Sequence, residues 1–341
     1  MPEKITTIKK KCTVSFSKDS ANLFFHILTE CNLNCIHCYI NKEQHGSGIL
    51  PLSTIESWLE IFASKKKKQN IVFLGGEPTL HTDLPEAIKK AKALKFNSIT
   101  VDTNGYLFND FLSKTDPDIL DYLSFSLDGV SSETNDRIRG KGSYDKCING
   151  IKKAVKKGFC TSLIYTVSNL NISELHKIPS LLKDLKIDRF FIQVIGIRGK
   201  SAKNKDGILQ AHKAEWLDII PETARNIADL GITVTYPKVY LNNDEKFECA
   251  GIVADNYFIS PNGRVYKCPL CEDFSLHSMI IKDNALITQR GNINESHLFG
   301  LNIPEGCVMN KIIQPENIIC KDGIPEYKIA CCMLKEEIRI P

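Results

Sequence analysis

The feature that most constrains this fold is a regular alternation of two kinds of segment. From about residue 23 to residue 196, short apolar runs rich in β-branched residues alternate with longer runs of helical spacing. Such alternation is typical of βα units, whose strands form a parallel sheet. We expect six strands, at residues 23–28, 70–74, 98–102, 122–127, 161–167 and 189–195. We expect helices near 51–64, 83–95, 107–114, 143–157 and 171–185, the last interrupted by Pro179.

The pattern changes after residue 196. Residues 196–207 are rich in Gly, Lys and Ser and are interpreted as a loop, followed by a helix near 211–229 and a short strand at 232–235. From Phe247 the helical periodicity fades, and a hairpin turning at residues 261–263 is expected. The predicted division is an N-terminal extension (1–20), an α/β core (21–200), a connecting helix and strand (201–246) and a small cysteine-rich α+β domain (247–341).

Composition narrows the class of protein. With 341 residues, 43% hydrophobic and 25% charged, the chain can bury a sizeable core. No apolar run approaches the roughly 18 residues needed to cross a bilayer, and the N-terminus lacks a signal peptide's apolar core, so a cytoplasmic protein without a membrane span is expected. The net charge of +4, from 44 basic and 40 acidic residues spread along the chain, gives no indication of a nucleic-acid partner.

The thirteen cysteines are informative because reducing conditions in the cytosol keep thiols free, which favours metal binding by clustered ones. Cys31, Cys35 and Cys38 fall within eight residues, directly after the first predicted strand. This position is the carboxyl-end mouth of a βα barrel, where such folds hold active sites. Three thiolates can bind three irons of a 4Fe–4S cluster and leave one iron open. A zinc site completed by His37 or His45 is the alternative.

The spacing C-x3-C-x2-C followed by the aromatic Tyr39 resembles the radical S-adenosylmethionine (radical SAM) superfamily. The resemblance implies a partial (β/α)6 TIM-like barrel whose cluster binds SAM at the open iron. Reductive cleavage would then yield a 5′-deoxyadenosyl radical that abstracts hydrogen from a substrate. It also implies a reducing partner such as flavodoxin or ferredoxin.

Further segments carry the resemblance at successive strand ends. Gly75-Gly76-Glu77-Pro78 is similar to the family's GGEP motif, which holds the methionine amino group, and segments 103–105, 124–129, 135–144 and 193–196 are similar to those that meet the ribose, carboxylate and adenine. A simple Gly-Pro turn and core packing of the aromatic ring are the structural alternatives. The resemblance implies these SAM contacts: Tyr39, Gly75, Gly76, Glu77, Pro78, Asn104, Ser126, Asp128, Arg139, Val194 and Arg198. No residue is assigned as catalytic.

The C-terminal cysteines carry a second resemblance. The spacing C-x13-G-x4-C from Cys249 through Gly263 to Cys268 is similar to the opening of SPASM and Twitch auxiliary-cluster domains, although the C-x2-C-x5-C-x3-C run of a full SPASM domain is missing. We expect one auxiliary 4Fe–4S cluster, or one with an open iron, because a hairpin returns its flanking cysteines to one place. The expected ligands are Cys249 and Cys268, completed from Cys271, Cys307 and Cys332. Adjacent Cys331 and Cys332 are not expected to bind the same cluster, and Cys12, Cys147 and Cys160 are interpreted as structural.

The expected reaction is an oxidative modification of a peptide or natural-product intermediate through hydrogen abstraction, because an auxiliary cluster can accept an electron from a substrate radical. A small-molecule dehydrogenase or carbon-skeleton enzyme is the alternative within the superfamily. An iron–sulfur electron carrier would have no use for the GGEP and strand-end residues. The sequence names neither the substrate nor the oligomeric state.

Overall fold

The computed structural model describes residues 13–203, 209–315 and 318–339. Cys12 and most of the expected N-terminal extension lie outside the described residues. The strands that build the main sheet are β1 (Ser20–His26), β2 (Lys68–Leu74), β3 (Ser98–Thr103), β4 (Tyr122–Ser126), β5 (Thr161–Val167), β6 (Arg189–Val194), β7 (Thr233–Pro237), β9 (Asp255–Ile259), β10 (Arg264–Tyr266), β11 (Met279–Lys282), β12 (Ala285–Thr288) and β16 (Lys335–Ile338).

These strands form one curved sheet in the order β12-β11-β10-β9-β1-β2-β3-β4-β5-β6-β7-β16. Strands β1 to β7 are parallel to one another. The six strands expected for the barrel are confirmed to within three residues at each end. The short strand expected at 232–235 is β7, which extends the barrel beyond β6. An α/β barrel of the expected class is therefore present.

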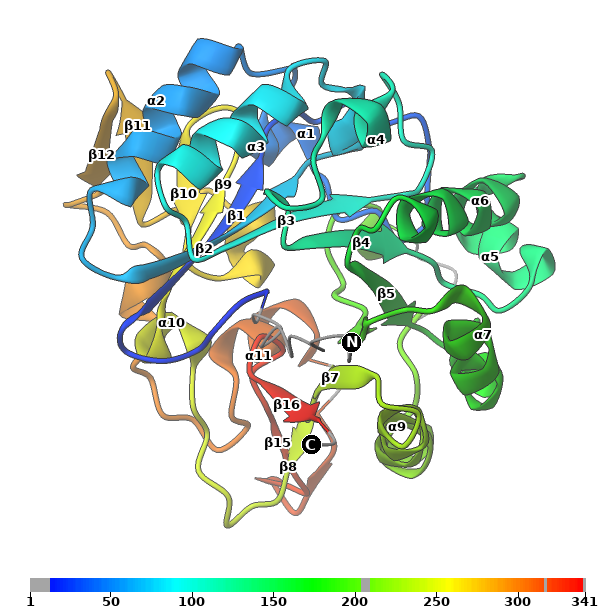
Figure 1. Cartoon of the computed structure of the whole chain (residues 1–341). Helices are drawn as coiled ribbons and strands as arrows, with labels where there is room; N and C mark the ends of the chain where they lie inside the picture. The colour runs from blue at the N-terminus through cyan, green and yellow to red at the C-terminus, as the bar shows by residue number, and fades with distance from the viewer. Residues whose placement is uncertain (1–12, 204–208, 316–317, 340–341) are drawn as a thin grey trace, which may run out of the picture.

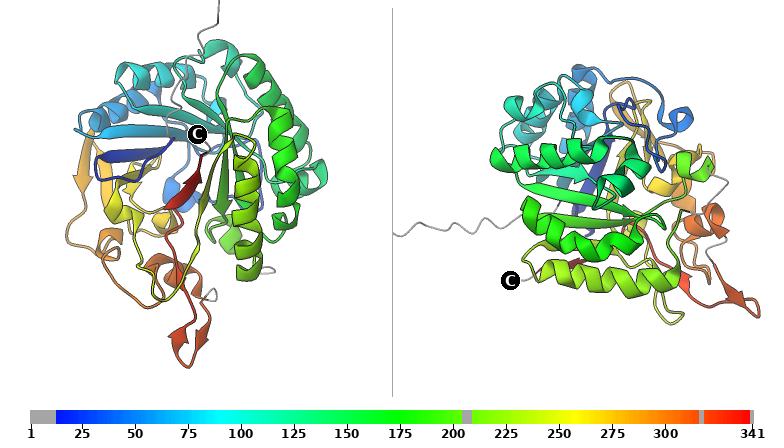
Figure 2. Two further views of the ribbon diagram at one scale, coloured as in Figure 1. Left: turned by 60° about the horizontal axis from the view of Figure 1, so that its bottom comes forward. Right: turned by 90° about the vertical axis from the view of Figure 1, so that its right-hand side faces the viewer.

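The C-terminal segment completes the sheet at both edges. Strand β9 pairs in parallel with β1, and β16 pairs antiparallel with β7. The rings of Phe24 and Phe258 stack across the first of these junctions, with centroids 4.3 Å apart. Figure 2 (left) shows the orange and red C-terminal segment on the open side of the curved sheet. The cysteine-rich region is thus joined to the barrel by backbone hydrogen bonds as well as by side-chain packing.

Helices cover the convex face of the sheet (Figure 1). The longer ones are α2 (Leu52–Ala63), α3 (Leu84–Ala93), α5 (Ser132–Arg139), α6 (Ser143–Lys156), α7 (Ile178–Leu185) and α9 (Lys213–Ala228). Short helices are α1 (Lys42–His45), α4 (Phe111–Lys114), α8 (Lys200–Lys203), α10 (Ala250–Val253), α11 (Val308–Ile313), η1 (Pro78–Leu80), η2 (Ile172–Lys177), η3 (Pro269–Asp273) and η4 (Glu295–His297).

Two predictions need correction. The helix expected over 171–185 is divided: a 3₁₀ segment, η2, ends at Lys177, and α7 begins with Pro179 in its first turn, where a missing N–H costs nothing. The loop expected over 196–207 contains the short helix α8. The hairpin expected at 261–263 is confirmed, since β9 and β10 are antiparallel and Gly263 turns with a φ of +83°.

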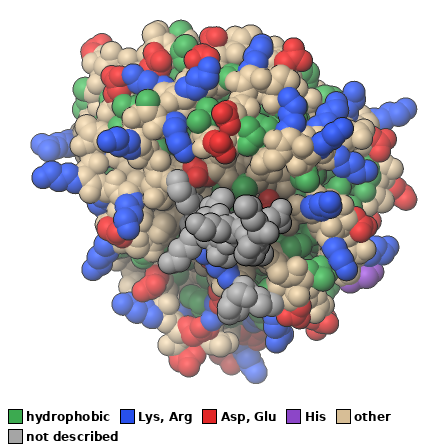
Figure 3. All heavy atoms as spheres, viewed as in Figure 1, with side chains coloured by type: hydrophobic (Ala, Val, Ile, Leu, Met, Phe, Trp, Pro, Cys, Tyr) green, Lys and Arg blue, Asp and Glu red, His purple; other side chains and the backbone are tan. Residues whose placement is uncertain are grey.

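The surface agrees with the diffuse charge of the sequence. Basic and acidic side chains are interspersed on the face seen in Figure 3, with no broad single-sign patch. Among the described residues, no helix has the length and apolar character required to span a bilayer.

Candidate active site

The three-cysteine loop follows β1 and lies at the carboxyl ends of the parallel strands. The thiols of Cys31, Cys35 and Cys38 are free; Cys31 is exposed and the other two are half-buried. The Leu33 N–H donates to Cys31 Sγ at 3.4 Å, and Asn104 Nδ2 lies 3.9 Å from the same sulfur. Donors that face a sulfur atom stabilise a thiolate more than a thiol. The loop therefore offers three sulfur ligands with hydrogen-bond donors beside them.

The electrostatics of these thiols match a site for a cation. Burial raises the pKa of Cys31 to about 11, and the charges of Glu77, Cys35 and Cys38 add to this effect. The Cys31 thiol therefore stays protonated near neutral pH in the absence of a cation and releases its proton when one binds. The donor set fits an iron–sulfur cluster. For the zinc alternative, His37 Nε2 faces Asp128 at 3.2 Å and His45 Nε2 faces Glu272 at 3.4 Å, so these two nitrogens have carboxylate partners.

The Gly75-Gly76 pair allows the second strand end to approach the cysteine loop. A Cβ at Gly75, where φ is +157°, would lie 2.5 Å from the Leu28 carbonyl oxygen, and one at Gly76 would lie 2.0 Å from the Glu30 oxygen. The Gly76 N–H donates to Leu28 O at 3.2 Å. Only glycines fit here, because any side chain would push this segment away from Cys31.

Glu77 is fully buried and its carboxylate binds neighbouring protein groups. Oε1 accepts hydrogen bonds from the Thr79 and Thr103 hydroxyls at 2.6 and 2.8 Å, and Oε2 accepts one from the Asn104 N–H at 2.7 Å. These bonds fasten the ends of β2 and β3 together. The buried Pro78 begins η1 directly after it. The expected contact of the Glu77 side chain with a methionine amino group stays a prediction, and the described bonds assign it a supporting position.

Asp128 and Arg139, both expected near SAM, form a buried ion pair. Arg139 Nε lies 2.6 Å from Asp128 Oδ2, and His37 approaches the same oxygen. Burial opposes ionisation of Asp128, but Arg139 and His37 lower its pKa to about 2. The Arg139 carbonyl accepts from Cys35 Sγ at 3.7 Å. The pair links the end of β4 to the cysteine loop, and half-buried Ser126 is the last residue of that strand.

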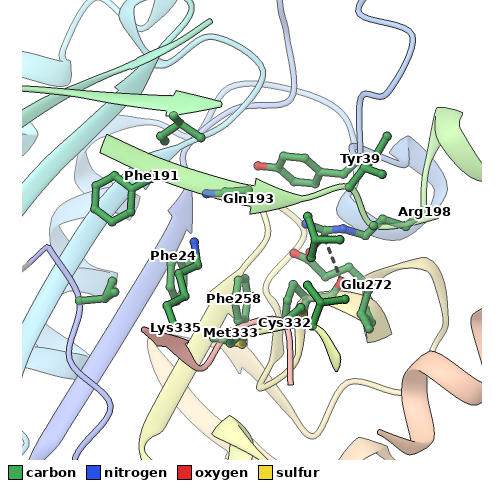
Figure 4. Close-up of a pocket in the computed structure, with 18 of the residues that line it drawn as sticks. Phe24, Tyr39, Phe191, Gln193, Arg198, Phe258, Glu272, Cys332, Met333 and Lys335 are labelled. Carbon is green, nitrogen blue, oxygen red and sulfur yellow. Dashed lines mark hydrogen bonds and ion pairs between the residues drawn. The ribbon is translucent and has the colours of Figure 1, made fainter. Parts of the chain in front are cut away.

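A cavity of about 260 Å³ opens inside the barrel. Tyr39, Val194 and Arg198, three of the expected SAM contacts, line it together. The Arg198 guanidinium lies over the Tyr39 ring, 4.3 Å from its centroid. Figure 4 shows Tyr39 and Arg198 on one side of the cavity and Phe24, Phe258 and Lys335 on the other. Three residues that the sequence predicts to contact SAM therefore lie at one cavity, and their contacts with SAM stay predictions.

A buried polar network that the sequence did not reveal lies behind Tyr39. His26 Nε2 is 2.8 Å from the Tyr39 hydroxyl, and Glu272 pairs with both Arg198 and His45. Among the described residues, His26, His45 and Glu272 have the spacing of metal ligands. Their polar atoms already contact one another, Tyr39 and Arg198. Because Glu272 follows Cys271 directly, the network connects the C-terminal cysteines to the Tyr39 end of the cavity.

The C-terminal cysteines converge as expected. Cys249, Cys268, Cys307, Cys331 and Cys332 line a second, small cavity of about 20 Å³. Cys271 hydrogen-bonds to Cys268 at its side. The number of free thiols here is sufficient to bind one cluster. The sulfur atoms would have to move apart to bind it. Exposed Cys320, on β13 (Cys320–Lys321), has no place in this group.

Cys331 is the cysteine that the sequence interpretation left out. Its sulfur hydrogen-bonds to Cys249, which raises the pKa of Cys249 and lowers that of Cys331. Cys332, which was among the expected ligands, lines both the small cavity and the barrel cavity. Cys331 and Cys332 therefore have different neighbours. The contact with Cys249 makes Cys331 a candidate ligand of an auxiliary cluster.

A comparison with known families agrees with this geometry. Residues 26–182 match the model of the Radical SAM superfamily. The chain contains a radical SAM domain. The matched region contains the three-cysteine loop, the GGEP segment and the Asp128–Arg139 pair, and the match implies binding of a 4Fe–4S cluster and SAM.

Characterised relatives cover different shares of this radical SAM protein. The Fe-coproporphyrin III synthase of Methanosarcina barkeri is 32% identical over 224 residues, 64% of this chain and 55% of that protein. The chain thus spans about half of that relative's length. A probable GTP 3′,8-cyclase of Saccharolobus islandicus is 26% identical over 269 residues, 76% of this chain and 85% of the relative.

Solved structures share the fold at low identity. Streptococcus suis SuiB bound to the precursor peptide SuiA superposes with a TM-score of 0.58 and 16% identity, over 75% of this chain and 60% of SuiB. The anSMEcpe structure with bound AdoMet and a peptide gives a TM-score of 0.57 and 14% identity, over 89% of this chain and 84% of that one. At such identities the comparison supports the architecture alone.

Proposed function

We propose that this radical SAM enzyme cleaves SAM reductively and uses the resulting radical to abstract hydrogen from a peptide or natural-product substrate in a net oxidation. Cys332, which borders both the barrel cavity and the C-terminal cysteine cavity, carries the oxidative part of the proposal. A second cluster there would lie beside the substrate volume. Electron transfer from a substrate radical to such a cluster would complete an oxidation.

Cys31, Cys35 and Cys38 would hold the first cluster, and the auxiliary cluster would be held by Cys249, Cys268 and Cys331 with Cys271, Cys307 or Cys332 as further ligands. When bound, the first cluster with SAM supplies one-electron cleavage of a carbon–sulfur bond, which yields a 5′-deoxyadenosyl radical. A flavodoxin or ferredoxin would provide the electron.

The chain's own residues would orient and shield the reacting groups. The Gly75-Gly76 backbone leaves room beside Cys31, since no side chain fills that position. Tyr39 and Arg198 would enclose the adenine, and the apolar walls of the cavity would keep water from the radical. The buried Glu77 and the Asp128–Arg139 pair would hold the strand ends and the cysteine loop in register.

A small-molecule substrate is the second candidate, and the size of the cavity favours it. Ligand pockets usually measure about 300–1,000 Å³, and the cavity here is about 260 Å³. It would admit a small molecule or one side chain of a peptide. The relatives named as a coproporphyrin synthase and a GTP cyclase support small substrates for the family.

The test is deoxyadenosine formation from SAM by the anaerobically reconstituted enzyme with dithionite. We expect the Cys38→Ala variant to lose deoxyadenosine formation and Cys320→Ala, a matched change at an exposed cysteine outside both sites, to retain it. Equal rates in the two variants would refute the proposed role of the loop. For the oxidative step, Cys331→Ala should retain deoxyadenosine formation and lose the iron of the auxiliary cluster. Unchanged iron content would remove the basis for a net oxidation.

A further inference from the structure

We infer that Lys335 is an anchor for a substrate carboxylate, and that the barrel cavity takes an acid whose body is aromatic or otherwise apolar. The inference deepens the proposed function, because it rests on the cavity being the substrate site. The three-cysteine loop and the GGEP segment play no part in it. Lys335 lies on β16, the C-terminal strand that pairs with β7.

Lys335 forms no ion pair with a carboxylate among the described residues, although Asp102 and Cys332 are near enough to act on its charge. Its side chain lines the cavity, and among the described residues no carboxylate oxygen lies within 4.0 Å of its Nζ. The other basic residue of this region is already paired: Arg189 Nη2 lies 2.5 Å from Glu337 Oε2. A charged amine inside a protein is costly unless an anion accompanies it. The position therefore favours an anionic ligand.

The walls around Lys335 define the rest of the ligand. Its Nζ is 5.6 Å from the centroid of the Phe191 ring, and the stacked pair Phe24 and Phe258 forms the neighbouring wall. Figure 4 shows the amine pointing into the cavity among these rings. Trp216 adds a further aromatic side chain to the lining. Flat aromatic rings and one cation suit a planar or aromatic acid.

Two acidic groups line the same cavity: Asp102, on β3, and Glu272, which is already paired with Arg198 and His45. Asp102 is therefore the acidic group that remains to be considered. Burial raises its pKa to about 7, so its negative charge is weakened near neutral pH. Burial also lowers the pKa of Lys335 to about 8, which leaves the amine mainly charged at pH 7. At that pH the amine can bind an incoming carboxylate.

Lys335 also lies away from the expected SAM contacts. The Phe191 ring, which lies near the Lys335 amine, precedes Val194 by three residues on β6. It is therefore farther from the carboxyl end of that strand than Val194 is. A carboxylate held by Lys335 would therefore leave the Tyr39 and Arg198 end of the cavity free.

The probe for the test is 4-fluorophenylacetate, and its uncharged analogue 4-fluorophenylacetamide is the control ligand. Binding to the reconstituted enzyme with SAM is followed by ¹⁹F NMR titration. We expect the acid to bind the unaltered enzyme about tenfold or more tightly than the amide, the size of one hydrogen bond to a charged group. Lys335→Met should remove this preference and leave the affinity for the amide unchanged.

Matched variants separate charge from structure. Lys335→Arg should keep the preference for the acid, and Asp102→Asn should keep or increase it. Lys282→Met, a change at an exposed lysine on β11, should have no effect. Equal affinities for acid and amide in the unaltered enzyme, no binding of either probe, or a preference retained in Lys335→Met would each overturn the inference.

A separate readout distinguishes this inference from the proposed function. Deoxyadenosine formation without substrate should be the same in Lys335→Met and in the unaltered enzyme, because Lys335 lies outside the cysteine loop and the expected SAM contacts. If the unaltered enzyme forms no deoxyadenosine, the proposed function fails whatever the probes show. If deoxyadenosine forms and the probes do not distinguish acid from amide, only the assignment of Lys335 fails.

Discussion

Replacement of Gly76 by alanine provides a sharp test of how the strand end supports the cysteine loop. The added Cβ would lie 2.0 Å from the Glu30 carbonyl oxygen and 2.8 Å from Cys31 Cβ. A carbon–oxygen contact requires about 3.3 Å, so Glu30 or the substituted residue must move by roughly 1 Å. The first atom belongs to the backbone just before Cys31 and the second to the Cys31 side chain. The Glu77 N–H that follows Gly76 is itself bonded to Glu30 O at 2.9 Å. The displacement would therefore reach the first cysteine.

A misplacement of about 1 Å in a reacting arrangement can lower the rate about 100-fold. We expect Gly76→Ala to reduce deoxyadenosine formation by about that factor. The free energy of unfolding should fall by about 1–3 kcal/mol, as at other overpacked sites, which is too little to unfold the protein. The variant should thus remain folded while it loses SAM cleavage.

The assay measures deoxyadenosine by chromatography after anaerobic reconstitution, with circular dichroism to confirm folding. Gly300→Ala is the matched control, because no atom lies within 4 Å of its added Cβ and its φ is not positive. If Gly76→Ala and Gly300→Ala form deoxyadenosine at the same rate, the close approach of Gly76 to the cysteine loop has no functional importance and the reasoning is wrong.

Three further predictions concern the ion pairs around the site. Asp128→Asn leaves the buried Arg139 unpaired, so the free energy of unfolding in urea should fall by about 3–5 kcal/mol; an unchanged urea midpoint would contradict this. Although burial opposes ionisation of Asp128, Arg139 and His37 hold its pKa at about 2, below its unfolded value of about 4. The stabilisation from Asp128 is therefore present above about pH 4 and is lost as the pH falls toward 2. In acid titrations of the iron-free protein, the free energy of unfolding should decrease over that interval. A free energy of unfolding that does not change with pH there would contradict the ion pair. Glu272→Gln removes the charge that pairs with Arg198, and we expect SAM binding in equilibrium dialysis to weaken by about tenfold, whereas unaltered binding would separate this pair from the SAM site.

Much of the barrel could be predicted because its signals are local. Each strand from β1 to β6 is a short buried apolar run, and each is followed by a segment with helical spacing, so the elements are visible without knowledge of their partners. The position of Cys31, Cys35 and Cys38 followed from the same pattern, since the carboxyl ends of parallel strands lie at one mouth. The convergence of Cys249 and Cys268 followed from the hairpin between them.

Other parts of the site depend on contacts between distant segments. Nothing near Lys335 in the sequence indicates that β16 pairs with β7 and places this amine inside the barrel. The Cys331–Cys249 contact likewise joins residues that are far apart, and adjacent cysteines are ambiguous because successive side chains point to different faces. The hydrogen bonds of the Glu77 side chain to the Thr103 hydroxyl and the Asn104 N–H likewise depend on the neighbouring strand, while its expected contact with SAM stays a prediction. A sequence motif predicts the position of a residue along the chain and at a strand end. The contacts of its side chain depend on residues of the neighbouring strand, which the motif does not contain.

The most direct test of the account is the iron and sulfide content per chain after anaerobic reconstitution. The unaltered enzyme is compared with a variant in which Cys31, Cys35 and Cys38 are all replaced by alanine. Two clusters predict a decrease from about eight irons to about four. A decrease from about four irons to none would mean that the C-terminal cysteines hold no cluster, and it would contradict the proposed oxidative chemistry.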